Sequence, residues 1–321
     1  MARRISSTSD FAVSLAADTL RQGGLVAIPT ETVYGLGADA TNGTGVAGIF
    51  AAKGRPRFNP LIAHVADRAM AEATAVFDPL ARQLAEAFWP GPLTIVLPLR
   101  ETAGIHPLVG GGLPTIALRM PHGMARDIIA ALGSPVAAPS ANRSGRVSPT
   151  TADHVEASLG DRIDLIVDAG PAIVGLESTI VRPMGDRIVL LRAGGIPAAE
   201  IEAALGLPVV RPEPGAGIEA PGQLASHYAP HGRVRLGVTA VLPGEWLIAF
   251  GPGQIPGEES AAGIINLSPA GELREAAAQL FAALSALDSP EIEHIAVAPI
   301  PMTGLGEAIN DRLGRAAAPR V

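Results

Sequence analysis

The chain has 321 residues, of which 48% are hydrophobic and 17% are charged, and it contains no cysteine. A chain of this length exceeds the usual size of one hydrophobic core, so we expect two domains. The lack of cysteine excludes disulfides, thiolate metal sites and a cysteine nucleophile. The formal charge of −7 argues against a broad basic surface for nucleic acid. Apolar runs end well before about 18 residues and no apolar segment follows the first arginines, so we expect a cytoplasmic protein with no membrane span.

Short apolar strands alternate with amphipathic helices along the first two thirds of the chain. The pattern predicts helices over residues 11–22, 46–53, 79–88, 124–132 and 198–205. It predicts strands over residues 25–29, 94–99, 115–120, 136–139, 165–168, 179–182 and 188–192. Interleaved strands and helices indicate an α/β fold, and the adjacent pair 179–182 and 188–192 indicates a twisted, mixed sheet.

The pattern lapses over residues 206–232, where prolines and glycines disfavour helices and strands. We predict a long linker there, of the kind that can serve as a lid. A smaller, Rossmann-like α/β domain follows, with strands over 234–238, 246–250, 264–267 and 295–298. Its helices are predicted from a Ser268 cap, with Pro269 at the first position, to Leu287 and over 305–317. The expected domains are therefore 1–205 and 233–321.

Lysine is nearly absent, because 23 of the 24 cationic residues are arginine and Lys53 is the only lysine. A composition bias of this strength should replace an indifferent surface lysine by arginine. Lysine carries a compact ammonium that the planar guanidinium cannot imitate. We therefore expect Lys53 to have a function, with chance survival as the alternative.

Polar clusters interrupt the apolar segments at six places. They are 29–37 (P-T-E-T-V-Y-G-L-G), 53–64 (K-G-R-P-R-F-N-P-L-I-A-H), 115–121 (T-I-A-L-R-M-P), 138–150 (A-P-S-A-N-R-S-G-R-V-S-P-T), 176–181 (L-E-S-T-I-V) and 191–195 (L-R-A-G-G). Polar turns at strand ends commonly bind ligands in α/β proteins, although a solvated turn is the alternative for the first cluster.

Two clusters suggest binding of anions. Lys53, Arg55 and Arg57 form a compact set of cations suited to phosphates, unless the loop is merely exposed. Arg119 ends an apolar strand, so its guanidinium needs an anion, which either a structural or a substrate carboxylate can supply. In the fourth cluster, Ser148 is expected to cap the next helix.

Several common motifs are absent: the G-x-x-x-x-G-K-[ST] phosphate loop, a G-x-G-x-x-G turn after the first strand, H-E-x-x-H and G-x-S-x-G. The histidines lack metal-ligand spacing, so we expect no metal-ligating residues and no organic cofactor. The cations, hydroxyls and amides that remain suit the positioning of a nucleotide and a small polar acid.

Taken in order, these segments resemble the YrdC-type family, whose motifs are P-T-E-T-V-Y-G-L-G, K-G-R-P-x-x-N-P-L-I-x-H, A-L-R-M-P, A-P-S-A-N-x-S-G, E-S-T-I-V and L-R-x-G. The resemblance covers about residues 8–205, and residues 220–230 resemble the linker of the longer, two-domain members. It implies a YrdC-like sheet and threonylcarbamoyl-AMP synthase activity, in which L-threonine, bicarbonate and ATP give threonylcarbamoyl-adenylate and pyrophosphate. The product would serve a separate transferase complex that modifies adenosine 37 of tRNA, so at most weak tRNA binding is expected.

The resemblance also assigns roles to residues. Lys53 and Arg55 are the expected catalytic residues, holding phosphates together with Mg²⁺ that accompanies ATP. The remaining expected ATP-binding residues are Arg57, Thr115, Asn142, Thr150, Arg192 and Tyr228. The expected threonine site consists of Thr30, His64, Arg119, Ser140 and Ser178, with Arg119 on the carboxylate. Such an enzyme works by placement and charge stabilisation, without a protein nucleophile.

The resemblance is incomplete in the linker. Some members carry a basic, tyrosine-containing run where this chain has residues 223–226 (Q-L-A-S). A cationic contact between the linker and phosphates is therefore not expected here.

Two other interpretations exist. Hydrogenase-maturation proteins contain a YrdC-type carbamoyl-transfer module, but it accompanies an acylphosphatase domain and cysteine-rich zinc motifs, which this chain lacks. An RNA-binding or ribosome-associated factor of the same fold is an alternative of a different class. The negative charge and the lack of a basic, aromatic surface argue against it as the main activity.

Overall fold

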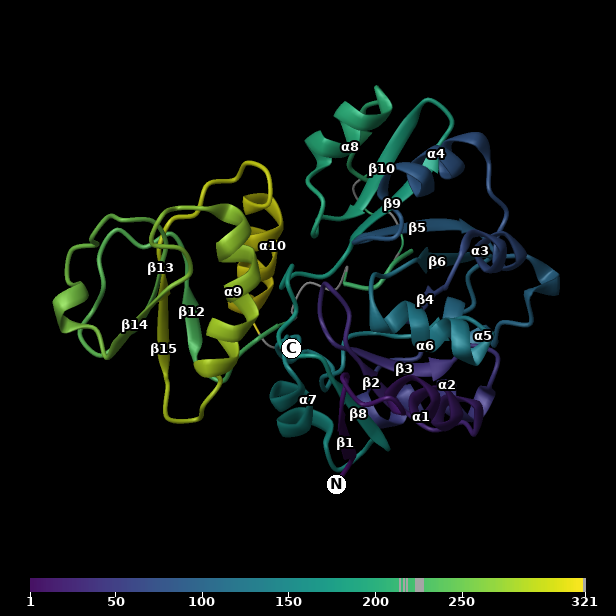
Figure 1. Ribbon diagram of the computed structural model, residues 1–321. Coiled ribbons are helices and arrows are strands. Elements are labelled where there is room, and N and C mark those ends of the chain that lie inside the picture. The colour runs from purple at the N-terminus through teal and green to yellow at the C-terminus, as the bar shows by residue number, and fades with distance from the viewer. Residues whose placement is uncertain (214, 216, 218, 223–227, 320–321) are drawn as a thin grey trace.

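The computed structural model describes residues 1–213, 215, 217, 219–222 and 228–319. In this part of the chain the strands form two sheets, one of eleven strands and one of four. Figure 1 shows the larger sheet on one side, the smaller sheet on the other, and the linker between them. No helix of the described residues is long and apolar enough to cross a bilayer.

The larger sheet has the strand order β1-β8-β2-β3-β7-β4-β6-β5-β9-β10-β11. Its strands are β1 (Arg3–Ser6), β2 (Val26–Ile28), β3 (Gly35–Asp39), β4 (Ile62–His64), β5 (Leu93–Pro98), β6 (Thr115–Arg119), β7 (Val136–Ala137), β8 (Leu165–Asp168), β9 (Thr179–Met184), β10 (Arg187–Arg192) and β11 (Val209–Val210). β4 and β6 are parallel, as are β5 and β9, whereas β5 and β6 are antiparallel, as are β9 and β10. The predicted mixed α/β sheet is confirmed.

Helices cover this sheet unevenly. They are α1 (Ala12–Arg21), α2 (Gly43–Lys53), α3 (Arg68–Thr74), α4 (Pro79–Phe88), α5 (Pro107–Gly110), α6 (Met124–Leu132), α7 (Ala152–Leu159) and α8 (Ala198–Leu205), with the short η1 (Glu101–Ala103). On one face, α2, α4 and α7 join the main core. On the opposite face, α1 and α6 cover only the part formed by β2, β7 and β8.

The remaining part of that second face carries a small apolar cluster, and no helix of the described residues contributes to it. The cluster consists of Ile62, Val96, Ala117, Ile180, Val189 and Leu191, with Ala220 of the linker packed against them. The linker therefore crosses the open part of this face.

The smaller sheet is parallel, with the order β12-β15-β13-β14. Its elements are β12 (Arg233–Arg235), β13 (Trp246–Ala249), η2 (Glu258–Ser260), β14 (Gly263–Asn266), α9 (Leu273–Ala286), β15 (His294–Val297) and α10 (Gly306–Ala317). α9 and α10 lie on the side of this sheet that faces the larger one (Figure 1). The buried side chains of both helices share one cluster with Val33, Val147, Leu176 and Tyr228. The contact between the two parts of the chain is thus a continuous apolar core.

Local sequence determines where α2 starts and stops. The side chain of Asn42 accepts hydrogen bonds from the backbone N–H groups of Thr44 and Gly45 at the start of the helix. Gly54 ends it in the left-handed conformation, with a φ of 61°, which costs glycine little because it has no Cβ. Lys53 is therefore the last helical residue, and Arg55 lies in the loop that follows.

Two capping predictions are wrong. Thr151, not Ser148, caps α7 and accepts a hydrogen bond from the His154 N–H. α9 begins at Leu273 rather than at Pro269, because the Gly271 N–H first closes a turn onto Ser268 O (3.1 Å). Ser268 still contacts the helix start, where its Oγ accepts a hydrogen bond from the Glu272 N–H at 2.9 Å.

The predicted element bounds are otherwise close. Helices 79–88, 124–132 and 198–205 and strand 165–168 match the structure, and the other predicted elements differ by one to three residues at an end. β1, β3, α3, α5 and α7 are among the elements without a predicted counterpart. The expectation of a linker without strands is wrong at Val209–Val210, which pairs with β10. A two-residue strand has no periodicity of its own, so only the neighbouring strand defines it.

Candidate active site

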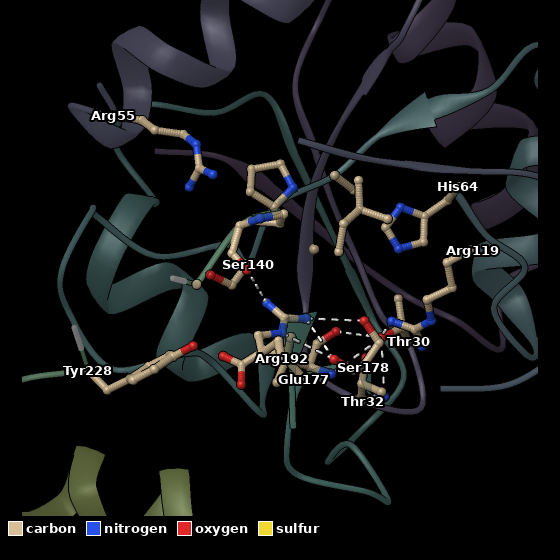
Figure 2. Close-up of a pocket in the computed structure, with 17 residues that line it drawn as sticks. Thr30, Thr32, Arg55, His64, Arg119, Ser140, Glu177, Ser178, Arg192 and Tyr228 are labelled. Carbon is tan, nitrogen blue, oxygen red and sulfur yellow. Dashed lines mark hydrogen bonds between the residues drawn. The ribbon is translucent and has the colours of Figure 1, made fainter. Parts of the chain in front are cut away.

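A cavity of about 60 Å³ lies on the open face of the larger sheet. All five residues expected to bind threonine line it, together with Arg55, Arg192 and Tyr228 of the expected ATP-binding residues. Linker residues Pro221 and Gly222 also line it. Figure 2 shows the polar groups of these residues gathered around one space. Small-molecule pockets commonly exceed about 300 Å³, so the cavity is narrow in this conformation.

The geometry of the sheet brings the lining side chains to one face. Ile62 and His64 are two residues apart on β4 and therefore point the same way. His64 is aligned with Arg119 on the neighbouring parallel strand β6. On β10 the register shifts between Leu190 and Arg192, and such an irregularity can redirect a side chain. Arg192 thus faces the cavity on the same side as its neighbour Leu191.

Arg119 has both a structural partner and spare donor capacity. Its Nη2 lies 2.7 Å from Glu31 Oε1, and its Nη1 donates a hydrogen bond of 2.8 Å to Thr32 Oγ1. The Nη2–Oε1 contact is an ion pair without hydrogen-bond alignment, so both buried atoms lack a hydrogen-bond partner among the described residues. Buried polar atoms of this kind are rare, and in a cavity wall they mark places for a polar ligand.

His64 offers a second such atom. Its Nδ1 is buried and has no hydrogen-bond partner among the described residues. Burial, assisted by the charge of Arg119, lowers the pKa of His64 to about 3. The ring is therefore neutral near pH 7 and can exchange a hydrogen bond with a ligand without adding charge.

Three cations next to this wall bind only neutral groups; Lys53 and Arg192 are buried, and Arg55 is partly buried. Lys53 Nζ donates to Ser140 O at 2.6 Å and to Asn142 O. The Arg55 guanidinium donates to the carbonyls of Asn59 (3.2 Å) and Pro60 (2.7 Å).

Arg192 is the third of these cations. It donates to Ser178 O at 2.9 Å and to Pro221 O at 3.3 Å. None of the three cations has a carboxylate within ion-pair distance in the described ranges.

This arrangement leaves positive charge uncompensated inside the protein. Burial lowers the pKa of Arg192 to about 10, and burial with repulsion from Arg192 lowers that of Arg55 to about 10. Burial also lowers the pKa of Lys53 well below its usual value. Buried cations are favourable only with an anionic partner, so the group is suited to bind an anion of several charges.

The other expected ATP-binding residues do not reach the cavity. The Lys53 ammonium lies behind the loop of residues 140–142, which separates it from the cavity. The Asn142 amide donates to the carbonyls of Arg143 and Arg146. Thr115 begins β6, at the opposite end from Arg119, Thr150 is buried against His154, and Arg57 is exposed. The roles of these residues stay predictions.

The linker closes directly over Arg192. A Cβ on Gly222 would lie 2.8 Å from Arg192 Cδ, and Gly222 has a φ of 88°. Tyr228 is 1% exposed, and its ring lies 5.3 Å from that of Phe281 on α9. The expectation about residues 223–226 lies outside the described residues.

Three functional candidates were missed or left without a role. Glu31 and Glu177 stand inside recognised motifs, and the need of Arg119 for an anion could have identified Glu31. Glu177 is 6% exposed and accepts hydrogen bonds from Ser148 Oγ (2.6 Å) and Arg312 Nε (2.8 Å). Burial alone would raise the pKa of Glu177, but Arg312 and Arg192 hold it at about 2. No sequence signal singles out Arg312.

Comparisons with known proteins identify the family of the chain. Residues 18–194 match the family described as Telomere recombination, and residues 196–318 match the family described as Threonylcarbamoyl-AMP synthase, C-terminal domain. The threonylcarbamoyl-AMP synthase of Bacillus subtilis (strain 168) is 40% identical over 98% of this chain and 95% of its own length. That of Pyrococcus abyssi (strain GE5 / Orsay) is 38% identical, over 97% and 96%.

The fold comparison extends to both sheets. The crystal structure of P. abyssi Sua5 complexed with L-threonine has a TM-score of 0.87 and 36% identity, covering 99% of this chain and 97% of that one. Both family matches and these full-length relatives include the smaller domain as well as the larger. The chain therefore belongs to the threonylcarbamoyl-AMP synthase family, in its two-domain form.

Proposed function

We propose that this chain joins L-threonine, bicarbonate and ATP into threonylcarbamoyl-adenylate and pyrophosphate. The observation that carries the proposal is the pairing of two environments in one cavity. Arg192 is buried and Arg55 partly buried there, neither with a carboxylate partner among the described residues, and beside them buried atoms of Arg119 and His64 have no hydrogen-bond partner in the described part of the chain. The first environment suits phosphates and the second suits a small polar acid.

The proposed chemistry needs placement more than reactive side chains. The threonine amine adds to bicarbonate with loss of water and forms a carbamate. A carbamate oxygen then attacks the α-phosphorus of ATP as the bond to pyrophosphate breaks. Arg55 and Arg192 would offset the charge that develops on the leaving pyrophosphate, because preorganised cations in a buried site stabilise such charge strongly. Arg119 would hold the threonine carboxylate and so fix the direction of the amine.

Mg²⁺ fits this site as a companion of ATP. Among the residues that the structure describes, no three His, Asp or Glu side chains are placed to hold a metal ion. The Glu177 carboxylate in the cavity wall is already bonded to Ser148 and Arg312. Mg²⁺ commonly binds through phosphate oxygens and water, so we propose that it arrives on the nucleotide and adds positive charge near the phosphates.

We also propose that residues 206–232 act as a lid between a catalytic domain, 1–205, and a smaller domain, 233–321. The closed cavity of about 60 Å³ is too small for ATP and threonine, and Arg192 is bonded to Pro221 of the linker. ATP entry therefore requires the linker to move, and Arg192 would then exchange carbonyls for phosphate oxygens. Closure afterwards would protect the carbamate and the adenylate from water.

The test is a reaction with ATP, Mg²⁺, labelled threonine and bicarbonate. We expect pyrophosphate release that depends on both threonine and bicarbonate, and a labelled adenylate on chromatography. ATP turnover that is indifferent to threonine would overturn the assignment. As part of the same proposal, based on family membership, the product passes in the cytoplasm to a separate transferase that modifies tRNA position 37.

A further inference from the structure

The smaller domain places a charged side chain next to the cavity. Arg312 of α10 has a fully buried side chain, and its Nε donates a hydrogen bond of 2.8 Å to Glu177 Oε2. Its Nη2 donates to Ala193 O at 2.8 Å, and its Nη1 pairs with Asp311. The guanidinium therefore joins α10 to two segments of the larger domain that flank Arg192.

The linker tyrosine belongs to the same contact. The Arg312 guanidinium lies over the Tyr228 ring at 5.4 Å, and the Phe281 ring lies on Tyr228 at 5.3 Å. Tyr228 lines the cavity and is labelled beside Glu177 and Arg192 in Figure 2. Its backbone is left-handed, with a φ of 63°, a conformation that a tyrosine keeps only where its surroundings hold it. The smaller domain thus fixes both a wall residue and a charge of the site.

The contact of Arg312 with Glu177 affects the charge balance around Arg192. Glu177 and Arg192 both line the cavity, and each influences the pKa of the other. The two carboxylate oxygens of Glu177 nevertheless accept hydrogen bonds from Ser148 and Arg312, while Arg192 donates to carbonyls and to the Ser178 hydroxyl. Without Arg312, Glu177 would be a buried carboxylate with one strong acceptor unsatisfied, and Arg192 is the cation of the cavity wall whose charge already acts on it.

We propose that Arg312 is a positioning residue that neutralises Glu177 and thereby keeps Arg192 available for a phosphate group. The proposal rests on the proposed function in one respect, which is that the phosphates of ATP are the ligand of Arg192. In this view the smaller domain contributes directly to nucleotide binding, through one ion pair across the domain boundary. Arg312 itself touches no substrate.

The test compares Arg312→Gln with the double variant Glu177→Gln/Arg312→Gln. A non-hydrolysable ATP analogue with Mg²⁺ is the probe, its dissociation constant is measured by calorimetry, and a thermal melt reports the folded fraction. We expect Arg312→Gln to weaken analogue binding by at least about tenfold and the double variant to regain most of that loss, because no carboxylate is left to hold Arg192. Arg274→Gln, an exposed site on α9, removes the same charge from the same domain and should bind as the native chain does.

A purely structural role for Arg312 makes a different prediction. Removing the ion pair would then weaken the domain contact in both variants, and the double variant would bind no better than Arg312→Gln. That result overturns the proposal, as does unchanged binding in Arg312→Gln. If Arg312→Gln does not fold, Glu177→Gln alone is compared with the double variant. The proposal requires equal analogue binding in these two, within about threefold, and weaker binding in the double variant overturns it.

The outcome is independent of catalysis. Analogue binding does not require threonine, bicarbonate or product formation, so it reports on the nucleotide site and not on catalysis. If the native chain forms no adenylate while binding follows the expected pattern, the proposed function fails and the role of Arg312 stands. If adenylate forms but the double variant shows no recovery, the reverse holds.

Discussion

Replacing Arg119 by lysine tests the threonine half of the site. In the structure the Arg119 guanidinium makes an ion pair with Glu31, donates to Thr32 Oγ1 and Gly91 O, and retains an Nη2 group without an aligned acceptor. A lysine ammonium keeps the charge opposite Glu31, so the variant does not leave a buried carboxylate alone. It has one nitrogen in place of three, however, and cannot hold Glu31, Thr32 and a ligand together.

The size of the effect follows from the contact that is lost. A hydrogen bond to a charged group contributes about 1.5–3 kcal/mol, and each 1.4 kcal/mol corresponds to about a tenfold change in binding. If the Arg119 Nη2 group holds the threonine carboxylate, Arg119→Lys should raise the threonine KM by roughly 10- to 150-fold. The KM for ATP should change by less than about threefold, because Arg55 and Arg192 are untouched.

The assay is pyrophosphate release measured against threonine and, separately, against ATP, with threonine binding checked by calorimetry. Arg126→Lys is the matched control, because Arg126 donates to Ala66 O from α6 and does not line the cavity. A threonine KM within about threefold of the native value in Arg119→Lys would show that the carboxylate binds elsewhere. An equal rise in both KM values would instead indicate general damage to the site.

Three further changes probe other parts of the site. Lys53→Arg should lower kcat/KM by at least about tenfold and lower the melting temperature, because a guanidinium is too large for the buried space between Ser140 O and Asn142 O. Near-native activity in this variant would mean that the lone lysine survived by chance. When the pH falls from 7 to 4.5, the free energy of unfolding should fall by about 2–3 kcal/mol less in His64→Gln than in the native chain. The pKa of His64 in the folded state, about 3, lies below the usual 6.5, so the unfolded state binds the proton first as the pH falls and the native chain is destabilised. An equal dependence of melting temperature on pH in the variant and the native chain would contradict that pKa. Gly222→Ala should disfavour the closed linker and speed the release of a fluorescent ATP analogue, measured by stopped-flow. Gly217→Ala is the control, because its Cβ would meet no atom within 4 Å, and it should not change the release rate. Equal release rates in the two variants would argue against a lid at this position.

The five residues expected to bind threonine were named by resemblance to a family, and local rules explain why some of them share one face of the sheet. A residue at the end of a short apolar strand faces a predictable side of a sheet, and His64, Arg119 and Ser178 all stand at strand ends within recognised motifs. Their motifs lie far apart in the chain, yet the resemblance to one family links them. The structure brings all five expected threonine residues to one cavity without further adjustment.

Lys53 shows where such reasoning ends. Composition and motif indicated that an ammonium is needed, but neither could tell a phosphate from a backbone carbonyl as its partner. In the closed structure the partners are Ser140 O and Asn142 O, so the lysine holds the loop that forms the cavity wall. The phosphate contact expected for Lys53 is therefore not present in this conformation, and the need for an ammonium at this position stays a prediction.

Arg312 was beyond prediction for a different reason. α10 carries glutamate, asparagine, aspartate and arginine among its apolar residues, a composition typical of a solvated helix face. Whether one of these arginines is buried depends on how the smaller domain docks, which involves Val33, Val147 and Leu176 of the larger domain. Docking of this kind has no periodic signal in either sequence segment, so the buried charge could be found only in the folded chain.

The distribution of carboxylates explains how one small cavity can distinguish its two substrates. Arg119 is paired with Glu31, which leaves the threonine side nearly neutral and able to accept a single carboxylate by exchange or sharing of hydrogen bonds. Glu177 is paired with Arg312, which leaves Arg55 and Arg192 with surplus positive charge on the other side. A ligand with several negative charges gains the most binding energy beside Arg55 and Arg192, where positive charge is in surplus. The interaction energy of two buried charges grows with the product of the charges and is weakly screened. Threonine, with one carboxylate and an amine, gains little there. We therefore propose that the two glutamates, which bind neither substrate in this account, determine which end of the cavity takes which substrate.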